Sequence, residues 1–318
     1  MTDPLSPVAP EVEAELRDEL VAVMQRVPEL AGRRLSLSVL SGGITNRNFL
    51  VRSPDLAQRY VIRMGGTDTH LLGISREVEQ AATAAAAAVG VGPEVVAFIR
   101  PEGFLLTRFI NGSPVSPERI GEPAMLERVA DSLRRIHTGP AIPGVFVPLR
   151  IVEGYRALAA DRGVPIPPAY ERAREAGRRI ERALLASPVD PLPCHNDLLN
   201  ANFIDDGERL RIVDWEYAGM GDPSFDLGNF SINHELPPDA DEALLRAYEG
   251  GVRPARLARL RLMRVVSDFR EAMWSVLQQG ISSLDFDFVA YADEHFERLL
   301  ASASTPDFER ALQDASGG

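Results

Sequence analysis

The stretch CHNDLLNANF, residues 194–203, gathers a Cys, a His, an Asp and three Asn in a segment patterned like a strand end and a loop. Its core is His195-x-Asp197-x4-Asn202, and Asp214 follows at the end of the next strand-like segments. An amide oxygen and a carboxylate suit magnesium, a hard ion that prefers oxygen ligands and keeps waters. Zinc would require three or four protein ligands, and the sequence has no H-E-x-x-H motif. The spacing is typical of kinase-type phosphoryl transfer, in which the first Asp orients the acceptor hydroxyl while the Asn and second Asp hold metal on the nucleotide.

The composition narrows the classes of partner. The 318 residues carry a net charge of −12, which argues against a nucleic-acid surface because such a surface needs basic residues to neutralise phosphates. All 34 basic residues are Arg, so a G-x-x-x-x-G-K-[ST] phosphate loop and lysine Schiff-base chemistry are excluded. Phosphate would have to be bound by Arg, a metal ion or backbone amides.

The sequence also indicates a compartment. Cys194 is the single cysteine, so no intramolecular disulfide can form, which is compatible with a reducing environment. The first residues, MTDPLSPVAPEVEAEL, carry acids where a signal peptide has basic residues and then an apolar run. No segment approaches the roughly 18–20 apolar residues of a membrane span. We therefore expect a cytoplasmic protein without a membrane span.

The pattern of elements changes near residue 110. Before it, a helix over 10–27 and several short alternating segments predict a sheet of about five strands, interrupted by the Ala-rich helix in SREVEQAATAAAAAVG. After it, the strand-like pieces ANFIDD and RLRIVDW flank the polar loop, and the final STPDFERALQDASGG is expected to fray. Long helices are predicted at 122–137, 150–161, 168–187, 239–249, 253–280 and 285–303.

These elements predict an α+β fold of two lobes. A small mixed-sheet lobe over 1–110 would bind the nucleotide, and a larger helical lobe over 111–318 would hold the catalytic loop and the acceptor site. A cleft between two lobes is the natural position for the polar loop, because ligand sites occur preferentially where domains meet.

The segment CHNDLLNANFIDDGERLRIVDWEYAGMGDPSFDLGNF resembles the choline/ethanolamine kinase group, within the aminoglycoside-phosphotransferase branch of the protein-kinase-like fold. The resemblance implies ATP and Mg²⁺ as cofactors. It makes Asp197 the catalytic base and Asn202 and Asp214 the magnesium ligands. It also makes His195 a structural anchor of the catalytic loop and Asp226 a carboxylate that braces this loop.

The N-terminal lobe offers candidate nucleotide contacts. In SGGITNRNF, Gly42 and Gly43 would let backbone amides approach phosphates without an intervening Cβ, and Asn46 is a further candidate in the same segment. A simple hairpin turn would also explain the two glycines. Arg63 lies in YVIRM, on the strand where the kinase fold needs a cation for the phosphates, and no lysine is available there. A solvated edge Arg is the alternative.

The cation on this strand needs a carboxylate from the following helix. Glu77 and Glu79 both qualify, and because they are two apart they lie on different faces; the pattern of similar sequences favours Glu79 as the partner of Arg63. The connection LLTRFING would supply backbone groups to adenine, with Arg108 and Ile110 as candidates.

The acceptor site is predicted in the last helices. Glu271 and Trp274 are at i and i+3, on one helix face, and Tyr291 comes from the next helix. An ammonium would gain about 0.5–2 kcal/mol per aromatic ring by cation–π attraction, together with a counter-charge. Core packing of Trp274 is the alternative. Choline kinases usually have an aromatic where this chain has Glu271, which argues against choline itself; an acid at this position could hydrogen-bond a primary ammonium, as in ethanolamine, or an amine-bearing larger acceptor.

The sequence thus predicts an ATP- and Mg²⁺-dependent phosphotransferase for the hydroxyl of a small amino alcohol. Alternatives are a kinase for a bulkier acceptor, such as an aminoglycoside, a thiamine-like cation or a sugar, and a catalytically silent nucleotide-binding module. A metal-dependent phosphohydrolase would leave the small N-terminal lobe unexplained. The partner is expected to be a small molecule, not a nucleic acid, and a homodimer stays open.

Overall fold

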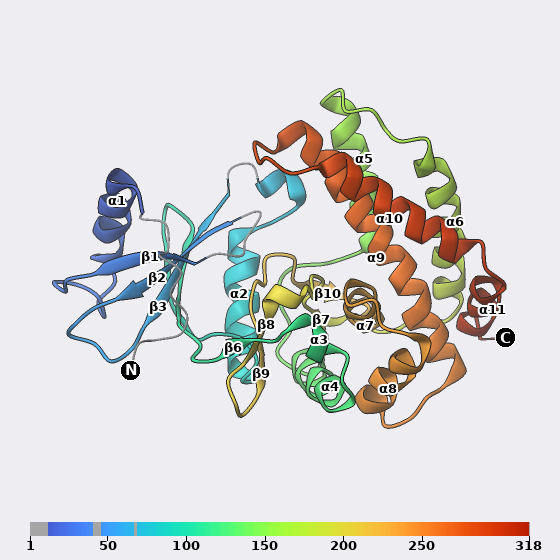
Figure 1. Cartoon of the computed structure of the whole chain (residues 1–318), viewed down its shortest axis with the longest axis horizontal. Helices are drawn as coiled ribbons and strands as arrows, with labels where there is room; N and C mark the ends of the chain where they lie inside the picture. Colours follow the sequence, from blue (N-terminus) through green and yellow to red (C-terminus); the bar gives the residue numbers. More distant parts are fainter. Residues whose placement is uncertain (1–11, 41–45, 67–68, 318) are drawn as a thin grey trace.

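The computed structural model describes residues 12–40, 46–66 and 69–317. An N-terminal sheet lies at one end of the molecule and a larger helical region at the other (Figure 1). The two glycines predicted to approach phosphate, Gly42 and Gly43, lie outside the described residues. Their role stays a prediction, as does the division of the chain at residue 110.

The N-terminal sheet has five strands in the order β1-β2-β3-β5-β4, and every pairing is antiparallel. The bounds are β1 Ser36–Leu40, β2 Asn46–Arg52, β3 Tyr60–Gly65, β4 Val95–Ile99 and β5 Phe104–Arg108. The α+β fold class is confirmed, but the sheet is antiparallel rather than mixed. Connectivity accounts for three of the four pairings, because β1 and β2, β2 and β3, and β4 and β5 are consecutive strands close in sequence, and such strands commonly pair antiparallel.

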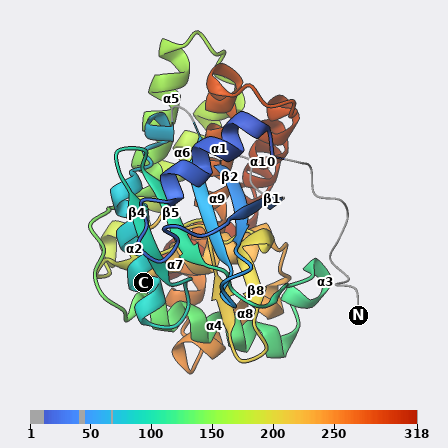
Figure 2. The same ribbon diagram turned by 90° about the vertical axis from the view of Figure 1, so that its left-hand side faces the viewer.

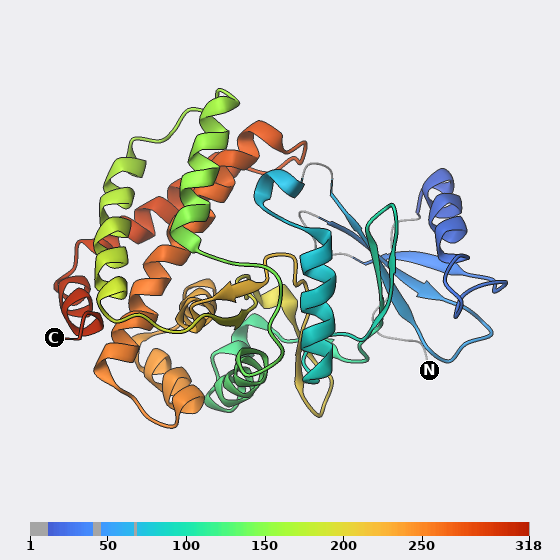
Figure 3. The same cartoon turned by 180° about the vertical axis from the view of Figure 1, so that it is seen from behind.

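Two helices cover opposite faces of this sheet. α1 (Ala14–Met24) lies on the face directed away from the helical region, and α2 (Arg76–Ala88) lies on the face directed toward it (Figures 1 and 3). Seen from the sheet end of the molecule, α1 is in front (Figure 2). Ser75 is the N-cap of α2, and its side chain accepts a hydrogen bond from the Val78 amide. The helix ends before Gly90, which has a φ of 74°. A helix commonly ends at a left-handed glycine of this kind.

The C-terminal region is built around α9, a helix of 28 residues. α9 packs against α5, α6, α7, α8, α10 and α11, and most of its residues are buried. The helices of this region are α3 Pro117–Ile120, α4 Pro123–His137, α5 Pro148–Asp161, α6 Ala169–Ala186, α7 Pro223–Asn233, α8 Pro238–Glu249, α9 Pro254–Ile281, α10 Phe288–Ala303 and α11 Pro306–Ala315.

Short strands and 3₁₀ turns lie where the two regions meet and hold the polar loop. β7 (Leu192–Cys194) pairs with β10 (Gly219–Gly221), while β8 (Phe203–Asp205) pairs with both β6 (Ser113–Pro114) and β9 (Leu210–Ile212). The loop with the polar cluster runs from the end of β7 to the start of β8. Two 3₁₀ turns complete the elements, η1 Thr69–Leu72 and η2 Asn200–Asn202.

The six long helices and both strand-like segments predicted for the C-terminal region are confirmed within a few residues. Three helices of this region were missed: the four-residue α3, α7 and α11. α7 is buried on nearly all sides, so it has no polar face to reveal a helical period. α11 forms where fraying was expected, because Thr305 caps its first turn and Phe308, Ala311 and Ala315 are buried. None of the described helices is long and apolar enough to cross a membrane.

Candidate active site

The backbone of the loop after β7 is held by Asp226, a fully buried carboxylate on α7. Asp226 Oδ2 accepts hydrogen bonds from the His195 amide at 2.8 Å and from His137 Nε2 at 3.0 Å. Its Oδ1 accepts one from the Asn196 amide at 2.7 Å. Burial acts to raise the pKa of Asp226, but these donors, His137 first, outweigh it and lower the pKa. Asp226 therefore stays ionised and braces the loop.

His195 joins this loop to the end of β9. Its Nε2 lies 3.0 Å from the carbonyl oxygen of Val213, which only accepts, so Nε2 carries the ring hydrogen. Nδ1 then accepts a hydrogen bond from the Asp197 amide at 3.2 Å. Burial lowers the pKa of His195, so the ring is neutral near pH 7. Both ring nitrogens bond backbone, which fits an anchor and leaves neither for a metal.

Cys194 and two neighbours have the spacing of a metal site. Among the described residues, His137, Cys194 and Asp226 form a group of ligand atoms within 4.8 Å of one another. However, both Asp226 oxygens accept hydrogen bonds, and His137 Nδ1 lies 2.6 Å from the Tyr248 hydroxyl. Burial raises the pKa of the Cys194 thiol, so the thiolate that a metal needs is disfavoured. This cluster is a brace for the loop.

Two of the three described non-glycine residues with positive φ are at the candidate site, and the third is Glu235. Asn196 and Asp214 have φ values of 68° and 70°, a left-handed conformation that costs about 1–3 kcal/mol in a residue other than glycine. At Asn196 the conformation is held by Asp226 on its amide and by a 3.1 Å hydrogen bond from Nδ2 to the Tyr217 carbonyl. The surrounding contacts therefore fix the turn that presents Asp197.

Asn202 and Asp214 provide an oxygen donor set. Asn202 Nδ2 donates to the backbone oxygen of Asp197 at 2.8 Å, so its Oδ1 is the atom left for a ligand. Asp214 Oδ1 accepts from Arg63 Nη2 at 2.6 Å, and its side chain is 23% exposed. One amide oxygen and one carboxylate oxygen match the ligands that Mg²⁺ prefers. The residues present fit the metal that phosphoryl transfer requires.

Arg63 extends from the sheet into a group of three carboxylates. Its Nε lies 2.8 Å from Glu79 Oε1, and its Nη2 lies 2.6 Å from Asp214 Oδ1 and 3.2 Å from Glu216 Oε2. Of the two acids considered on α2, Glu79 is the one that pairs with Arg63; Glu79 is buried and Glu77 is exposed. Burial acts to lower the pKa of Arg63, but the negative charges of the three carboxylates raise it by more. The pKa therefore lies above its ordinary value, and the side chain stays cationic.

Glu216 and Arg76 belong to the same network and were not predicted from the sequence. Arg76 Nη1 contacts both Glu79 at 2.6 Å and Glu216 at 3.3 Å. Asn46 Nδ2 donates to Glu216 at 2.9 Å, so the Asn46 side chain is directed into this network. Burial raises the pKa of Glu216, and Asp214 adds to the effect. Glu216 lies in the turn after β9, and Asp214 before it has a left-handed φ, so no strand period relates the two residues and no pattern in the sequence indicated Glu216.

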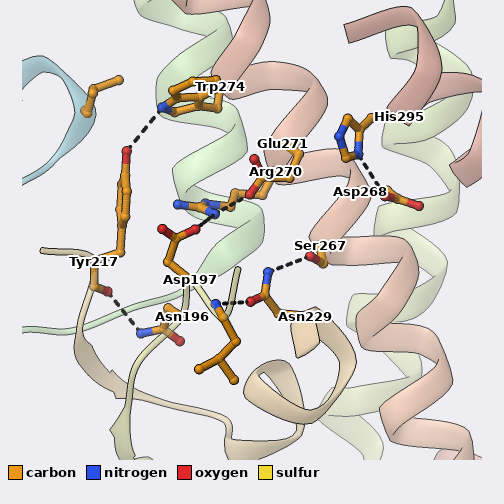
Figure 4. Close-up of polar contacts among 12 residues, drawn as sticks. Asn196, Asp197, Tyr217, Asn229, Ser267, Asp268, Arg270, Glu271, Trp274 and His295 are labelled. Carbon is orange, nitrogen blue, oxygen red and sulfur yellow. Dashed lines mark hydrogen bonds and ion pairs between the residues drawn. The ribbon is translucent and has the colours of Figure 1, made fainter. Parts of the chain in front are cut away.

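Asp197 itself lies against a buried arginine. Its Oδ1 is 3.2 Å from Arg270 Nη1, and the same Nη1 contacts Glu271 Oε1 (Figure 4). Burial raises the pKa of Asp197 to about 7, although Arg270 acts to lower it. A carboxyl group with a pKa near neutrality is suited to general-base catalysis at pH 7. The sequence prediction missed Arg270, because a charged residue beside Glu271 carries no signal that it is buried.

The three predicted acceptor residues lie together beside Asp197. Glu271 Oε2 accepts a hydrogen bond from the Tyr291 hydroxyl at 3.3 Å, and the Trp274 and Tyr291 rings meet edge to face at 6.1 Å. Trp274 Nε1 donates to the Tyr217 hydroxyl at 3.1 Å (Figure 4). Tyr217 was not predicted, although it lies in the same D-W-E-Y segment as Asp214. The acceptor side thus combines one carboxylate with several aromatic rings.

The two residues predicted to contact adenine lie at the end of β5. The Arg108 amide donates to the Glu94 carbonyl at 2.8 Å, so the sheet uses this donor. The Arg108 side chain forms ion pairs with Glu29 and Glu94. Ile110 follows the strand and is half-buried. Of these two, Ile110 is the better candidate for a backbone contact to a base.

Comparison with known proteins identifies the family. Residues 36–262 match the phosphotransferase enzyme family. The chain belongs to this family. A solved structure of a choline/ethanolamine kinase family protein from Mesorhizobium loti is 34% identical with a TM-score of 0.82, and the match covers 95% of this chain and all of that one. The resemblance inferred from the catalytic segment is therefore confirmed, and the chain is a phosphotransferase of the type that uses an alcohol acceptor.

Curated relatives are more distant. Ethanolamine kinase 2 of Homo sapiens is 28% identical over 288 residues, 81% of this chain and 73% of that protein. Protein LicA of Haemophilus influenzae is 27% identical over 214 residues, 65% of this chain but 61% of LicA. The matched part of this phosphotransferase therefore spans less than two thirds of LicA.

Proposed function

We propose that this phosphotransferase transfers phosphate from ATP, with Mg²⁺, to the hydroxyl of a small primary amino alcohol such as ethanolamine. The observation that carries the proposal is the juxtaposition of Asp197 with Glu271 through Arg270. A carboxylate for an ammonium group lies next to the carboxylate that would receive a hydroxyl proton. An amino alcohol carries a hydroxyl and an ammonium group, one for each of these carboxylates.

The nucleotide would bind between the sheet and the loop after β7. Arg63 provides the positive charge for phosphate oxygens, and Glu79 holds its guanidinium in place. Gly42, Gly43, Asn46, Arg108 and Ile110 remain predicted nucleotide contacts. Asn202 and Asp214 would hold Mg²⁺, which neutralises negative charge on the phosphates when bound.

Asp197 would act on the acceptor. Its carboxylate aligns the hydroxyl oxygen with the terminal phosphate and takes the hydroxyl proton as the new P–O bond forms, while the bond from the terminal phosphorus to the bridging oxygen breaks and ADP leaves. Positioning supplies much of the acceleration in such a reaction, and a general base contributes about 10²–10⁴-fold. The loop amides support such positioning: the Asn196 amide donates to Asp226, the Asp197 amide donates to His195 Nδ1, and beyond Asp197 the Leu198 amide donates to Asn229 Oδ1.

Several accompanying predictions belong to the same proposal. We place the enzyme in the cytoplasm, where its single buried Cys194 would stay reduced. The chain would work as two lobes, 1–110 for the nucleotide and 111–318 for catalysis and the acceptor. A homodimer is a prediction for solution measurement.

A panel of acceptors tests the proposal. Release of ADP from MgATP is measured by a coupled assay with ethanolamine, choline, an aminoglycoside, thiamine and a hexose. Ethanolamine should give the highest kcat/KM. A preference for the aminoglycoside, thiamine or the sugar would replace the amino alcohol with a bulkier acceptor. Nucleotide binding by calorimetry without ADP release from any acceptor would indicate a catalytically silent module.

A further inference from the structure

The acceptor side of Asp197 already contains a cation. The Arg270 side chain is among the largest fully buried side chains in the described part of the protein. It contacts Asp197 and Glu271, and its Cζ lies 4.3 Å from the centroid of the Tyr217 ring. A guanidinium over the face of a tyrosine is a cation–π contact. Arg270 therefore occupies the kind of place that an ammonium ligand takes in an aromatic cage.

This arrangement has different consequences for quaternary and primary ammonium groups. A quaternary ammonium has no N–H and binds through aromatic faces, but the guanidinium of Arg270 covers one face of Tyr217. To use that face, the ligand would have to displace a buried cation from both Asp197 and Glu271. Removing one partner from a buried charge pair is strongly unfavourable because it leaves a charge unpaired.

Trp274, the second aromatic side chain beside Glu271, is also buried by its neighbours. Trp274 is 7% exposed and is packed edge to face against Phe288 at 5.9 Å and Tyr291 at 6.1 Å. Its indole N–H is used by the Tyr217 hydroxyl. Trp274 is therefore buried, and Arg270 covers one face of the half-buried Tyr217 ring, so the two rings do not form an open pair of aromatic walls for a trimethylammonium group.

A primary ammonium needs oxygen acceptors instead, and the site has them. Glu271 Oε1 is held by Arg270, while Oε2 has only the 3.3 Å hydrogen bond from Tyr291 among the described residues. The long hydrogen bond leaves Oε2 able to accept from an N–H donor. A primary ammonium can bind there without moving Arg270 from Tyr217.

We infer that Arg270 sets the acceptor class of this enzyme: it excludes a quaternary ammonium from the Tyr217 face, leaves Glu271 Oε2 to a primary ammonium, and positions Asp197. The inference rests on the proposed function and deepens it. Arg270 acts through Asp197 and Glu271, so it is a positioning and specificity residue.

The test uses a graded series of acceptors. Ethanolamine, N-methylethanolamine, N,N-dimethylethanolamine and choline are compared in the wild type, R270M and R270K at saturating MgATP. In the wild type, kcat/KM should fall along the series. R270M removes the charge but keeps an unbranched side chain, so the ratio of ethanolamine to choline kcat/KM should fall by about tenfold or more. This is the size of effect expected when the Tyr217 face is opened to a cation.

The specificity role and the positioning role of Arg270 should affect different kinetic constants. The change in ratio should lie in the acceptor KM, while loss of Asp197 positioning should lower kcat for all acceptors. R270K keeps a cation beside Glu271 and should restore most of the preference. A purely structural role would lower kcat equally along the series and leave the ratio unchanged, and that result would overturn the inference.

A competition experiment on the wild type tests the inference even if a variant does not fold. Ethylammonium should compete with ethanolamine, whereas tetramethylammonium at the same concentration should not. Equal competition, or equal kcat/KM for choline and ethanolamine, overturns the role of Arg270 but leaves amino alcohol phosphorylation intact. Absence of phosphorylation of every member of the series would instead contradict the proposed function.

Discussion

The loop after β7 and the acceptor side of α9 stabilise their buried charged groups with different kinds of partner. In the loop, most partners of the buried polar groups are backbone: Asp226 accepts two amide hydrogens besides one hydrogen bond from His137, and the neutral His195 bonds one carbonyl and one amide. On α9, charges are neutralised by other side chains, because Arg270 lies between Asp197 and Glu271. Backbone partners satisfy both Asp226 oxygens and leave none for a ligand, whereas the side-chain partners of Glu271 leave its Oε2 with one long hydrogen bond. The first region is built to hold a shape, and the second is built to recognise a charged molecule.

Asp197 belongs to both regions, so its replacement should have the largest effect. D197N keeps the size of the side chain but removes the base, and turnover should fall by at least about 10²–10⁴-fold. Nucleotide binding, measured by calorimetry, should survive. D190N, at an exposed position, is the matched control and should retain wild-type turnover. Turnover of D197N close to wild type would remove Asp197 from the mechanism.

Asp214 tests whether the loop region also holds the metal. D214A removes one predicted magnesium ligand and one partner of Arg63. Binding of ATP in the presence of Mg²⁺ should weaken by about 10²-fold, which corresponds to about 3 kcal/mol. Calorimetry with and without Mg²⁺ measures the effect. If D214A keeps the full magnesium dependence of binding, the metal is held by other residues.

Asp226 tests the claim that backbone partners hold the shape of the loop. D226N replaces an acceptor of three hydrogen bonds by an amide whose NH₂ faces donors, so the free energy of unfolding should fall by about 2–4 kcal/mol. Urea unfolding followed by tryptophan fluorescence measures this change. D239N, at an exposed site, should change it little. Unchanged stability in D226N would show that the loop keeps its shape without the brace.

The smallest effect is expected at the partly exposed pair of Arg128 and Asp205, beside the loop. R128A should reduce the free energy of unfolding by less than about 1 kcal/mol at pH 7. The hydrogen bond from Arg128 lowers the pKa of Asp205 to about 2. A lowered carboxyl pKa stabilises the folded state above the unfolded pKa of about 4 and loses this effect as pH falls toward 2.

The pH dependence supplies the control for this last prediction. The difference in melting temperature between R128A and the wild type should be present at pH 7 and shrink between pH 4 and pH 2. A difference that stays constant over this range would mean that Arg128 stabilises the protein by packing and not by its charge.

The same contrast explains what the sequence could predict. Asp197, Asn202 and Asp214 could be proposed together from the sequence because one loop and one hairpin connect them, so their spacing along the chain indicates their geometry; their roles stay predictions. Glu271 and Trp274 were found because they share a helix face. Arg270 was missed, since it neighbours Glu271 and no rule of helix periodicity predicts that its guanidinium turns toward Asp197.

The sequence predicted the strands of the N-terminal sheet but not that neighbouring strands run antiparallel. Alternation reveals that β3 is a strand and that Arg63 and Val61 share a face, but it contains no information on whether a neighbour runs parallel. The buried helix α7 was missed for a related reason, because a helix without a polar face has no visible period. Patterns along the chain report exposure, and they fail where an element is covered on all sides.

The central position of α9 has a consequence for how this enzyme could acquire a new acceptor. Arg270, Glu271 and Trp274 are part of the helix against which six other helices pack. A substitution at any of them alters recognition and stability together, so mutations there would survive selection only with compensation elsewhere. Tyr291 on α10 is half-buried, so a substitution there should change the stability of the fold less. Divergence of acceptor preference should therefore begin at α10 and reach α9 later.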